Sequence, residues 1–393
     1  AAYGVRDRFG PEHLIPRPFD PRLITTVAPA VAEAAMKSGV ATRPIENLRA
    51  YRDRLGGFVY RSGTVMQPVF AAAAASGAAK RIVFAEGEDE RVLRAAQVVA
   101  DEGLARPVLV GRREAIEQQL RDLGLRIAAG QDFDVATMDG GAAAEEYYAL
   151  RRRHGVSPAQ AEVEMRRDAT LFAAMLLRRG AADGMLCGTS GAYAQHLRHI
   201  RAVIGRNEAA TAYAAMNLLM LPEQSVFLCD TQINPDPTAE QLVAITLLAA
   251  KAVRRFGVTP RVALLSHSNF GSADTSSARK MREAARLLWS RAPELEVEGE
   301  LQGDAALSRA VRERGFPGSR LTGDANLLVM PNLDAANITL SCLRVVSSQG
   351  VTVGPILLGT AKPAHILLPT TTVRGIVNMT ALTAAEASVQ PKE

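Results

Sequence analysis

The feature of this sequence that most limits its fold is a regular alternation, from Arg81 onward, of short apolar runs with segments of helical periodicity. Short buried strands that alternate with helices indicate parallel sheets covered on both faces. We therefore predict an α/β fold. The predicted strands are RIVFAE (81–86), RPVLVG (106–111), DGMLCG (183–188), SVFLCD (225–230), RVALLS (261–266) and NLLVMP (326–331).

Further signals mark the ends of helices. SPAQ (157–160) and TAEQ (238–241) are capping boxes, the first with proline at the first helical position. Gly180 and Gly257 stand where left-handed C-terminal caps are expected. These signals predict single long helices over 158–179 and 238–256.

The segment before Arg81 follows a different pattern. A proline-rich extended piece is predicted up to Pro21, and the alanine run at 71–75 is more consistent with helix than with a linker. Between them we predict a helix from about Ala28 to Ser38, a helix from Asn47 to Leu55 and a junction over 56–64.

Length and composition narrow the class of protein. The 393 residues suggest two or three domains at roughly 150 residues each. No apolar run approaches the roughly 20 residues that span a bilayer, so no membrane segment is expected. The net charge of +5 comes mostly from arginines that are interleaved with alanine and glutamate, and aromatic residues are only 5%. This pattern argues against a nucleic-acid surface and favours a small ligand that carries phosphate.

The three cysteines form neither a paired framework nor a CxxC motif. Cys187, Cys229 and Cys342 each lie next to an apolar run, so we expect buried free thiols. Free thiols are typical of a reducing compartment, and we therefore predict a cytoplasmic protein.

Three loops that follow predicted strands are rich in small polar residues: GTSGAY (188–193), DTQINPDPT (230–238) and SHSNFGSADTSS (266–277). In parallel sheets, ligands gather at the carboxyl ends of strands, where helix N-termini offer free amides to anions. Each loop alone is more typical of ordinary turns and helix caps, but three together indicate an anion site. No GxxxxGK[ST] or GxGxxG motif follows these strands, so nucleotides bound by the common loops are not expected.

The helix expected after GTSG carries two histidines one turn apart. His196 and His199 lack the carboxylates that would complete a metal shell, so we predict a solvated helix face and no metal site. Arg198 lies between them and is a candidate phosphate ligand. Ser190 is not the nucleophile of a hydrolase elbow, because Ala192 stands where that motif needs glycine.

From about Thr64 to its end, the chain resembles the phosphotransacetylases, which exchange an acetyl group between acetyl phosphate and coenzyme A. The resemblance rests on ADGMLCG (182–188), LCDTQINPDPTAEQLVAI (228–245), RVALLSHSNFGSA (261–273), LLVMPNLDAANI (327–338) and VGPILLGTAKP (353–363). It implies two α/β domains with parallel sheets around a cleft, a fold shared with isocitrate and isopropylmalate dehydrogenases. The domains would be 64–207 with 355–393, and 208–354.

The first 55 residues resemble the C-terminal segment of malic enzymes, through FGPEHLIPRPFDPRLITTVAPAVAEAAMKSGVATRPI. Both parts together are similar to the hybrid NADP-dependent malic enzymes, oxidoreductases that decarboxylate malate to pyruvate. Residues 1–63 would then be the end of the malic enzyme domain plus a linker. The resemblance implies a homo-oligomer, with NADP and a divalent metal bound only in the preceding domain of the same chain.

The resemblance also implies which residues bind ligand. The retained binding framework comprises Arg151, Thr189, Ser190, Arg198, Ser266, Ser268, Asn269, Gly271, Asn337 and Lys362. Three positions depart from the family: Leu368, Pro369 and Gly375 stand where active members have serine, arginine and aspartate. The aspartate would deprotonate the thiol and the other two would stabilise charge, and leucine, proline and glycine supply neither a base nor a donor. Thr231 and Phe270 also replace a cysteine and a lysine common in the family.

Three hypotheses follow. The first is a non-catalytic sensor of acetyl-CoA that controls a malic enzyme. The second is a working phosphotransacetylase in which His365 or Cys229 substitutes for the lost groups. The third is a structural assembly module whose ligand site is vestigial.

Overall fold

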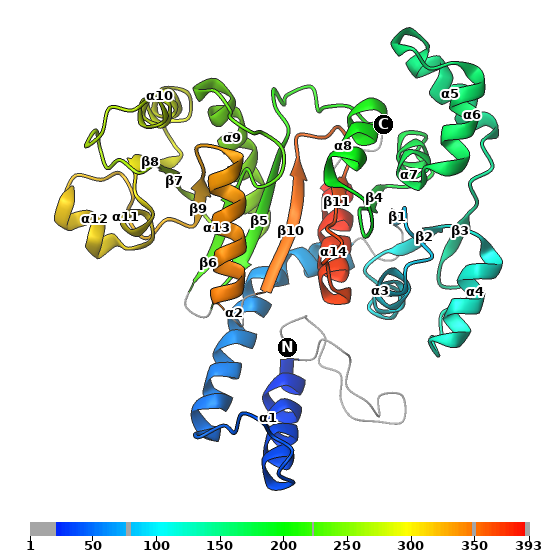
Figure 1. The fold of residues 1–393 in the computed structure, drawn as a ribbon, viewed down its shortest axis with the longest axis horizontal. Helices are drawn as coiled ribbons and strands as arrows, with labels where there is room; N and C mark the ends of the chain where they lie inside the picture. Colours follow the sequence, from blue (N-terminus) through cyan, green and yellow to red (C-terminus); the bar gives the residue numbers. More distant parts are fainter. Residues whose placement is uncertain (1–20, 76–79, 222–223, 348–350, 390–393) are drawn as a thin grey trace.

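The computed structural model describes residues 21–75, 80–221, 224–347 and 351–389, which form two β-sheets with helices around them (Figure 1). Parallel strand pairs dominate both sheets, and the predicted α/β class is confirmed. The proline-rich piece expected before Pro21 lies outside the described residues. None of the described helices is long and apolar enough to cross a membrane.

The first sheet has five parallel strands in the order β11-β4-β1-β2-β3. Three of them are the apolar runs predicted as strands, and their side chains are almost entirely buried, as expected for a parallel sheet with helices on both faces. The strands are β1 (Arg81–Phe84), β2 (Arg106–Val110), β3 (Asp134–Ala136), β4 (Gly184–Cys187) and β11 (Ala364–Ile366).

The second sheet has six strands in the order β10-β5-β6-β9-β7-β8, and β5 pairs antiparallel with both β6 and β10, so parallel pairs dominate this sheet without being its only kind. Only residues 221–224 separate β5 from β6, and so short a connection permits only antiparallel pairing of these two strands. The strands are β5 (Ala214–Met220), β6 (Ser225–Cys229), β7 (Arg261–Leu265), β8 (Glu296–Leu301), β9 (Leu327–Val329) and β10 (Val351–Leu358).

One of the two long helices was predicted correctly. α9 (Ala239–Arg255) begins at the Thr238 capping box and ends before Gly257, whose φ is 70°. The other splits into α6 (Pro158–Arg167) and α7 (Ala169–Arg178), because Asp168 adopts an extended conformation and accepts a hydrogen bond from the Leu171 amide. The other helices beside the sheets are α3 (Glu90–Asp101), α4 (Arg113–Asp122), α5 (Gly141–Arg151), α8 (Tyr193–Val203), α10 (Ser276–Arg291), α11 (Gly303–Leu307), α12 (Arg309–Gly315), α13 (Leu333–Val346) and α14 (Val373–Val389).

The N-terminal part forms a two-helix arm that extends away from the sheets (Figure 1). α1 (Pro21–Lys37) begins earlier than predicted. α2 (Leu48–Ala75) is one helix of 28 residues that includes the alanine run, and it continues through 56–64, where a junction was expected. The expected boundary after residue 63 therefore falls inside a helix, as the boundary after residue 354 falls inside β10.

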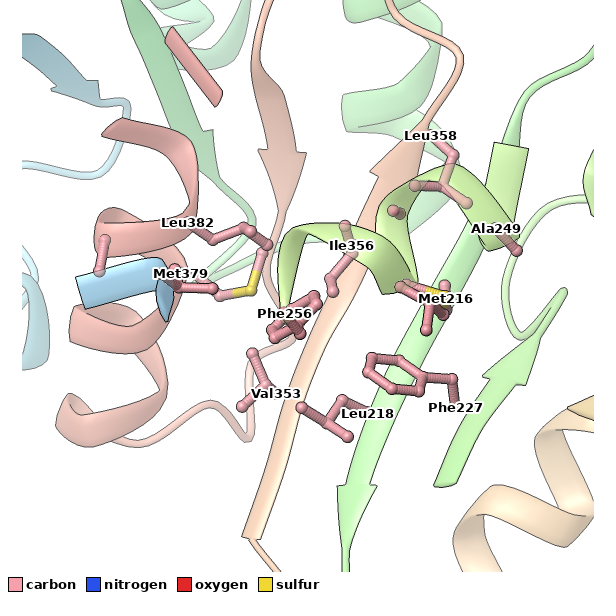
Figure 2. Packing of buried hydrophobic residues seen from close by; sticks show 14 of the residues in the cluster. Met216, Leu218, Phe227, Ala249, Phe256, Val353, Ile356, Leu358, Met379 and Leu382 are labelled. Atoms are coloured by element: carbon pink, nitrogen blue, oxygen red, sulfur yellow. The ribbon is translucent and has the colours of Figure 1, made fainter. Parts of the chain in front are cut away.

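The largest core includes side chains from both sheets and from the helices α2, α3, α9, α10 and α14. Figure 2 shows Met216 and Leu218 of β5 and Ile356 of β10 pointing to the same side as Met379 of α14 and Phe256. Because successive side chains of a strand alternate between faces, Asn217 lies on the opposite face of β5. Of the cysteines, Cys187 and Cys229 are buried as expected, but Cys342 is exposed on α13.

Candidate functional site

Two of the expected ligand residues line one pocket. Arg151 ends α5, and Arg198 and Arg201 lie nearly one turn apart on α8; with Gln232 they surround a cavity of about 410 Å³. No acidic residue lines it, and none of the three guanidinium groups pairs with a described carboxylate. Arg201 lies over the ring of Tyr213, 4.9 Å from its centroid. We call this cavity the arginine pocket; its chemistry fits a polyanion.

The loop between β4 and α8 is tightly fixed. Gly188 has a φ of 94°, and a Cβ atom there would lie 2.6 Å from the carbonyl oxygen of Leu367. The Gly188 amide donates to the carboxylate of Glu86 at 2.9 Å, and burial raises the pKa of Glu86 to about 7. Thr189 is buried, and its hydroxyl has no partner among the described residues. Ser190 is exposed.

The two histidines of α8 hold this loop against α7. His196 contacts the Thr170 hydroxyl and the Ser190 carbonyl, both at 2.7 Å, and His199 lies 2.9 Å from Asp168. Because a carbonyl can only accept, Nε2 of His196 carries the proton. Both rings are buried, so the predicted solvated face was wrong. No group of three metal-binding side chains occurs in the described part of the chain.

Arg91 was not recognised from the sequence. Its guanidinium donates to the carbonyls of Pro369 at 2.6 Å, Thr371 at 3.1 Å and Thr189 at 2.9 Å, and it pairs with Asp89 at 2.7 Å. It therefore joins the loops that follow β1, β4 and β11. The positions it joins lie up to 280 residues from it, so no local pattern could have revealed the contact.

Two of the three positions of the missing catalytic groups line a second cavity, of about 300 Å³, which we call the threonine cavity. Leu368 and Gly375 line it, whereas Pro369 is exposed outside the lining and gives its carbonyl to Arg91. The full lining is Asn217, Leu340, Arg344, Val351, Thr352, Gly354, Leu368, Thr370, Thr371, Thr372, Arg374 and Gly375. It contains no carboxylate, histidine or cysteine, and therefore no general base.

The proposed substitutes for the lost groups are not available to a ligand. His365 is fully buried in β11; its Nδ1 accepts from the Leu357 amide at 3.1 Å, and its Nε2 lies 3.1 Å from Glu386. Cys229 is fully buried in β6, and burial raises the pKa of its thiol well above the usual value. Neither side chain lines the arginine pocket or the threonine cavity.

The polar groups of the loop after β7 form hydrogen bonds with one another and with Glu300 and Gln302. Ser268 donates to Glu300 at 2.8 Å, the Gly271 amide donates to the same oxygen at 3.0 Å, and Asn269 exchanges hydrogen bonds with Gln302. Ser266 accepts from the Ser268 amide at 3.1 Å. β7 lies two strands from β6, so this loop stands about 10 Å along the sheet edge from Gln232.

Asn337 and Lys362, two further residues expected to bind ligand, lie in different places. Asn337 donates to the Thr231 carbonyl at 3.3 Å, next to Gln232 of the arginine pocket. Lys362 precedes β11, at the end of the sheet opposite to Thr189, and donates to the carbonyls of Leu177 and Arg178 at 3.1 and 3.2 Å. Its amine thus caps the C-terminal end of α7, where a cation is favourable.

Comparison with known proteins places these features in a family. The model for "Phosphate acetyl/butaryl transferase" matches residues 64–384. An NADP-dependent malic enzyme of Escherichia coli (strain K12) is 50% identical over the whole chain, which spans 52% of that protein. An NAD-dependent malic enzyme of Rhizobium meliloti (strain 1021) is 51% identical over 97% of the chain and 50% of its own length. The chain thus spans about half the length of these relatives.

A phosphate acetyltransferase of Nitratidesulfovibrio vulgaris is 35% identical but matches only 79% of the chain and 44% of its own length. Among solved structures, a phosphotransacetylase from Streptococcus pyogenes has a TM-score of 0.73 at 30% identity, covering 86% of this chain and 98% of its own. The phosphotransacetylase fold is confirmed, and the likeness to malic enzymes extends through the segment before residue 64, as the sequence resemblance implied. The chain belongs to the phosphate acetyl/butaryl transferase family.

Proposed function

We propose that the chain is the non-catalytic, acetyl-CoA-binding regulatory part of a cytoplasmic NADP-dependent malic enzyme, with NADP and a divalent metal bound by the preceding part of the full-length protein. The observation that carries this proposal is the contrast between the two cavities. The arginine pocket has three guanidinium groups that pair with no carboxylate among the described residues, and no acid or base for acyl transfer lines the threonine cavity.

The arginine pocket supports binding of a CoA ester. Coenzyme A carries several phosphate charges, and three cations that share one pocket without carboxylates repel one another until an anion is bound. Arginine also matches phosphate geometry with two parallel donors, which lysine cannot do. The Nε of Arg151 is buried and has no partner among the described residues.

The threonine cavity supports the absence of catalysis. Transfer of an acetyl group from phosphate to a thiol needs a base for the thiol and positive or donor groups for the developing charge. Leucine and glycine stand at two of the three positions where active family members have catalytic groups, and the side chains of His365 and Cys229 are fully buried. A bound thioester would therefore remain intact.

The continuity of α2 supports communication with the preceding segment. Its C-terminal half is anchored by Met66 and Val69 in the same hydrophobic core as Ile376 and Met379 of α14, and α14 begins at the threonine cavity. Its 28 residues extend about 42 Å, from this core to α1. Regulation needs two states that bind the effector with different affinity, and a helix that crosses the boundary can carry such a difference to its far end.

The direct test is calorimetric titration of the chain with acetyl-CoA. We expect binding, and we expect Arg198→Ala to weaken it by about 10- to 100-fold, since a hydrogen bond to a charged group contributes about 1.5–3 kcal/mol. Arg167→Ala, at an exposed arginine of α6, serves as the control and should leave the affinity unchanged. No heat and no thermal shift at millimolar acetyl-CoA would refute the proposal.

Two further assays separate the alternatives. Production of acetyl-CoA from acetyl phosphate and CoA would restore the enzyme hypothesis, above all if His365→Ala abolished it. In the full-length protein, acetyl-CoA should change the rate of malate decarboxylation, and Arg198→Ala should remove that change. A wild type that binds acetyl-CoA without any change in rate would contradict the regulatory role.

Self-association is a second candidate function, because α13 exposes an apolar stripe. Ile338, Val345 and Val346 are 62%, 75% and 81% exposed, and Ile338 and Val345 lie seven residues apart on the same face of the helix. We propose that this stripe supports a homo-oligomer. Sedimentation of Ile338→Asp should show a smaller species than wild type, and Val163→Asp, at an exposed valine of α6, is the control. An unchanged sedimentation coefficient would leave scaffolding without support.

A further inference from the structure

We propose that a third cavity, at the amino end of β11, binds a medium-chain fatty acid, which is a ligand with an aliphatic chain and one carboxylate. The cavity has a volume of about 680 Å³ and lies between α9, the end of β10, the residues before β11 and the end of α14. We call it the rear cavity. Its size is within the range of small-molecule sites in proteins.

The rear cavity is separate from the two cavities described above. Its lining shares no residue with the arginine pocket or the threonine cavity. Lys362 and Pro363 directly precede β11 and line the rear cavity, whereas Leu368 follows β11 and lines the threonine cavity. The buried strand β11 therefore lies between the two cavities. A ligand of the rear cavity can bind without competing with a CoA ester.

One face of α9 forms a wall of the rear cavity and changes in character along its length. The cavity-lining residues of this face recur at spacings of three and four, and they are Ala244, Leu247, Leu248, Lys251 and Arg255. From the first of them to the last, the face extends about 16 Å. Its first part is apolar and its last part is cationic. A ligand with one apolar end and one anionic end matches this order.

The strand side of the cavity is apolar as well. Leu358 of β10 is 5% exposed, and Figure 2 shows its side chain next to the helix that carries Ala249, which is α9. Pro363 is also buried. Each CH₂ group that becomes fully buried between such walls raises affinity about fourfold. None of the described residues that line the cavity is aromatic, so a flat ring finds no stacking partner there.

Glu386 is an acidic side chain in the lining, but its two oxygens already have partners. One oxygen pairs with Arg255, and the other lies 3.1 Å from Nε2 of His365. Nδ1 of His365 accepts from the Leu357 amide at 3.1 Å, so in the neutral ring Nε2 is the nitrogen that carries the proton. Glu386 and Arg255 thus neutralise each other, and Glu386 does not cancel the charge of the other cations.

Lys251 and Arg254 supply the remaining positive charge of this wall. Both side chains are exposed, and neither pairs with a carboxylate among the described residues. Water stabilises both charges in the free protein, so a bound carboxylate adds only an exposed ion pair, which raises affinity by up to about fivefold. We therefore expect the apolar walls to provide most of the affinity and the two cations to favour an acid over the corresponding alcohol.

Calorimetric titration of the chain with decanoate tests this inference. We expect one decanoate to bind per chain. Hexanoate, which is shorter by four CH₂ groups, should bind at least tenfold more weakly, because the apolar walls provide most of the affinity. Decanol, which has the same chain without the charge, should bind about threefold more weakly.

Two variants separate the apolar wall from the charged one. Leu247→Asp places a carboxylate on the apolar part and should weaken decanoate at least tenfold; Leu247 is 39% exposed, so the variant should fold. Val163→Asp, at an exposed valine of α6, is the control and should bind decanoate as wild type does. The double variant Lys251→Gln, Arg254→Gln should bind decanoate and decanol equally.

The inference is overturned if decanoate does not bind at millimolar concentration, if hexanoate binds as tightly, or if Leu247→Asp binds decanoate as wild type does. It is also overturned if decanoate does not bind and Leu247→Asp lowers the sedimentation coefficient, because a second copy of the chain then covers this wall. Acetyl-CoA affinity should be the same in wild type and Leu247→Asp. Failure of decanoate to bind therefore leaves the proposed function intact.

Discussion

Replacing Arg91 with alanine is expected to release the loop after β11 from the first sheet. The guanidinium donates to three backbone carbonyls, those of Thr189, Pro369 and Thr371, and it is the connection between the loop that carries the lost catalytic positions and the loop that leads into α8. Alanine removes all three hydrogen bonds and the pair with Asp89 together.

The size of the effect can be worked from these contacts. Hydrogen bonds to charged groups contribute about 1.5–3 kcal/mol each when buried, which gives an upper range of about 5–9 kcal/mol for three. The side chain of Arg91 is 32% exposed, and Pro369 is exposed as well, so water replaces part of each bond after the substitution. Allowing about 1 kcal/mol for each bond, we expect the free energy of unfolding to fall by about 3 kcal/mol.

Urea denaturation measures this loss, and hydrogen exchange locates it. The amides of Leu368 and Thr371 form hydrogen bonds within the loop, and both should exchange faster in Arg91→Ala. Arg94→Ala is the matched control, since Arg94 lies on the same helix and pairs with Glu90 at the surface; it should change stability by less than about 0.5 kcal/mol. If Arg91→Ala and Arg94→Ala behave alike, Arg91 is not what holds the loop.

Three other predictions follow from the same structure. Burial raises the pKa of Glu86 from 4.5 to about 7, so the folded protein holds this proton more tightly than the unfolded chain. The stabilisation from this proton is complete below about pH 4.5 and is lost, by about 3 kcal/mol, as pH rises through 7; the difference in unfolding free energy between wild type and Glu86→Gln should follow this change in denaturation experiments. Lys362→Met should cost about 1 kcal/mol by removing the cap of α7, with acetyl-CoA affinity within twofold of wild type; a larger loss of affinity would restore Lys362 as a ligand residue. Two glycines inserted within 56–64 of the full-length protein should abolish the response of malate decarboxylation to acetyl-CoA while binding persists, whereas the same insertion within 40–46, outside α1 and α2, should abolish neither.

Six of the strands that the structure describes could be predicted from their apolar runs, and β3, β5, β8, β10 and β11 could not. All six runs predicted as strands form strands, because a parallel strand between two helical layers needs an unbroken apolar run. β5 and β10 were missed because neither forms a strand-helix unit: β5 turns directly into β6, and β10 contains Gly354 and Pro355, which usually indicate a break.

The errors in helices and histidines share one cause, which is a contact that depends on the fold. Asp168 interrupts an apolar helical pattern because its side chain caps α7 and lies against His199. The histidines of α8 look like a surface pair in the sequence, but α7 covers them. Neither effect can be predicted from the pattern of a single helix, because each depends on how α7 and α8 pack together.

In the threonine cavity, the lost motif argues against acyl transfer but does not decide whether the cavity binds a ligand. The sequence predicts correctly that Leu368 and Gly375 bring no acid or base to this place, and from this alone the site would count as inert. The structure adds two arginines, from α13 and α14, that no motif pointed to because they lie 30 residues apart. Arg344 is exposed to solvent, so water stabilises its charge, whereas Arg374 is only partly exposed and lies in the first turn of α14. The cavity therefore has positive charge and free helix amides but no base, which fits binding of an anion without acyl transfer.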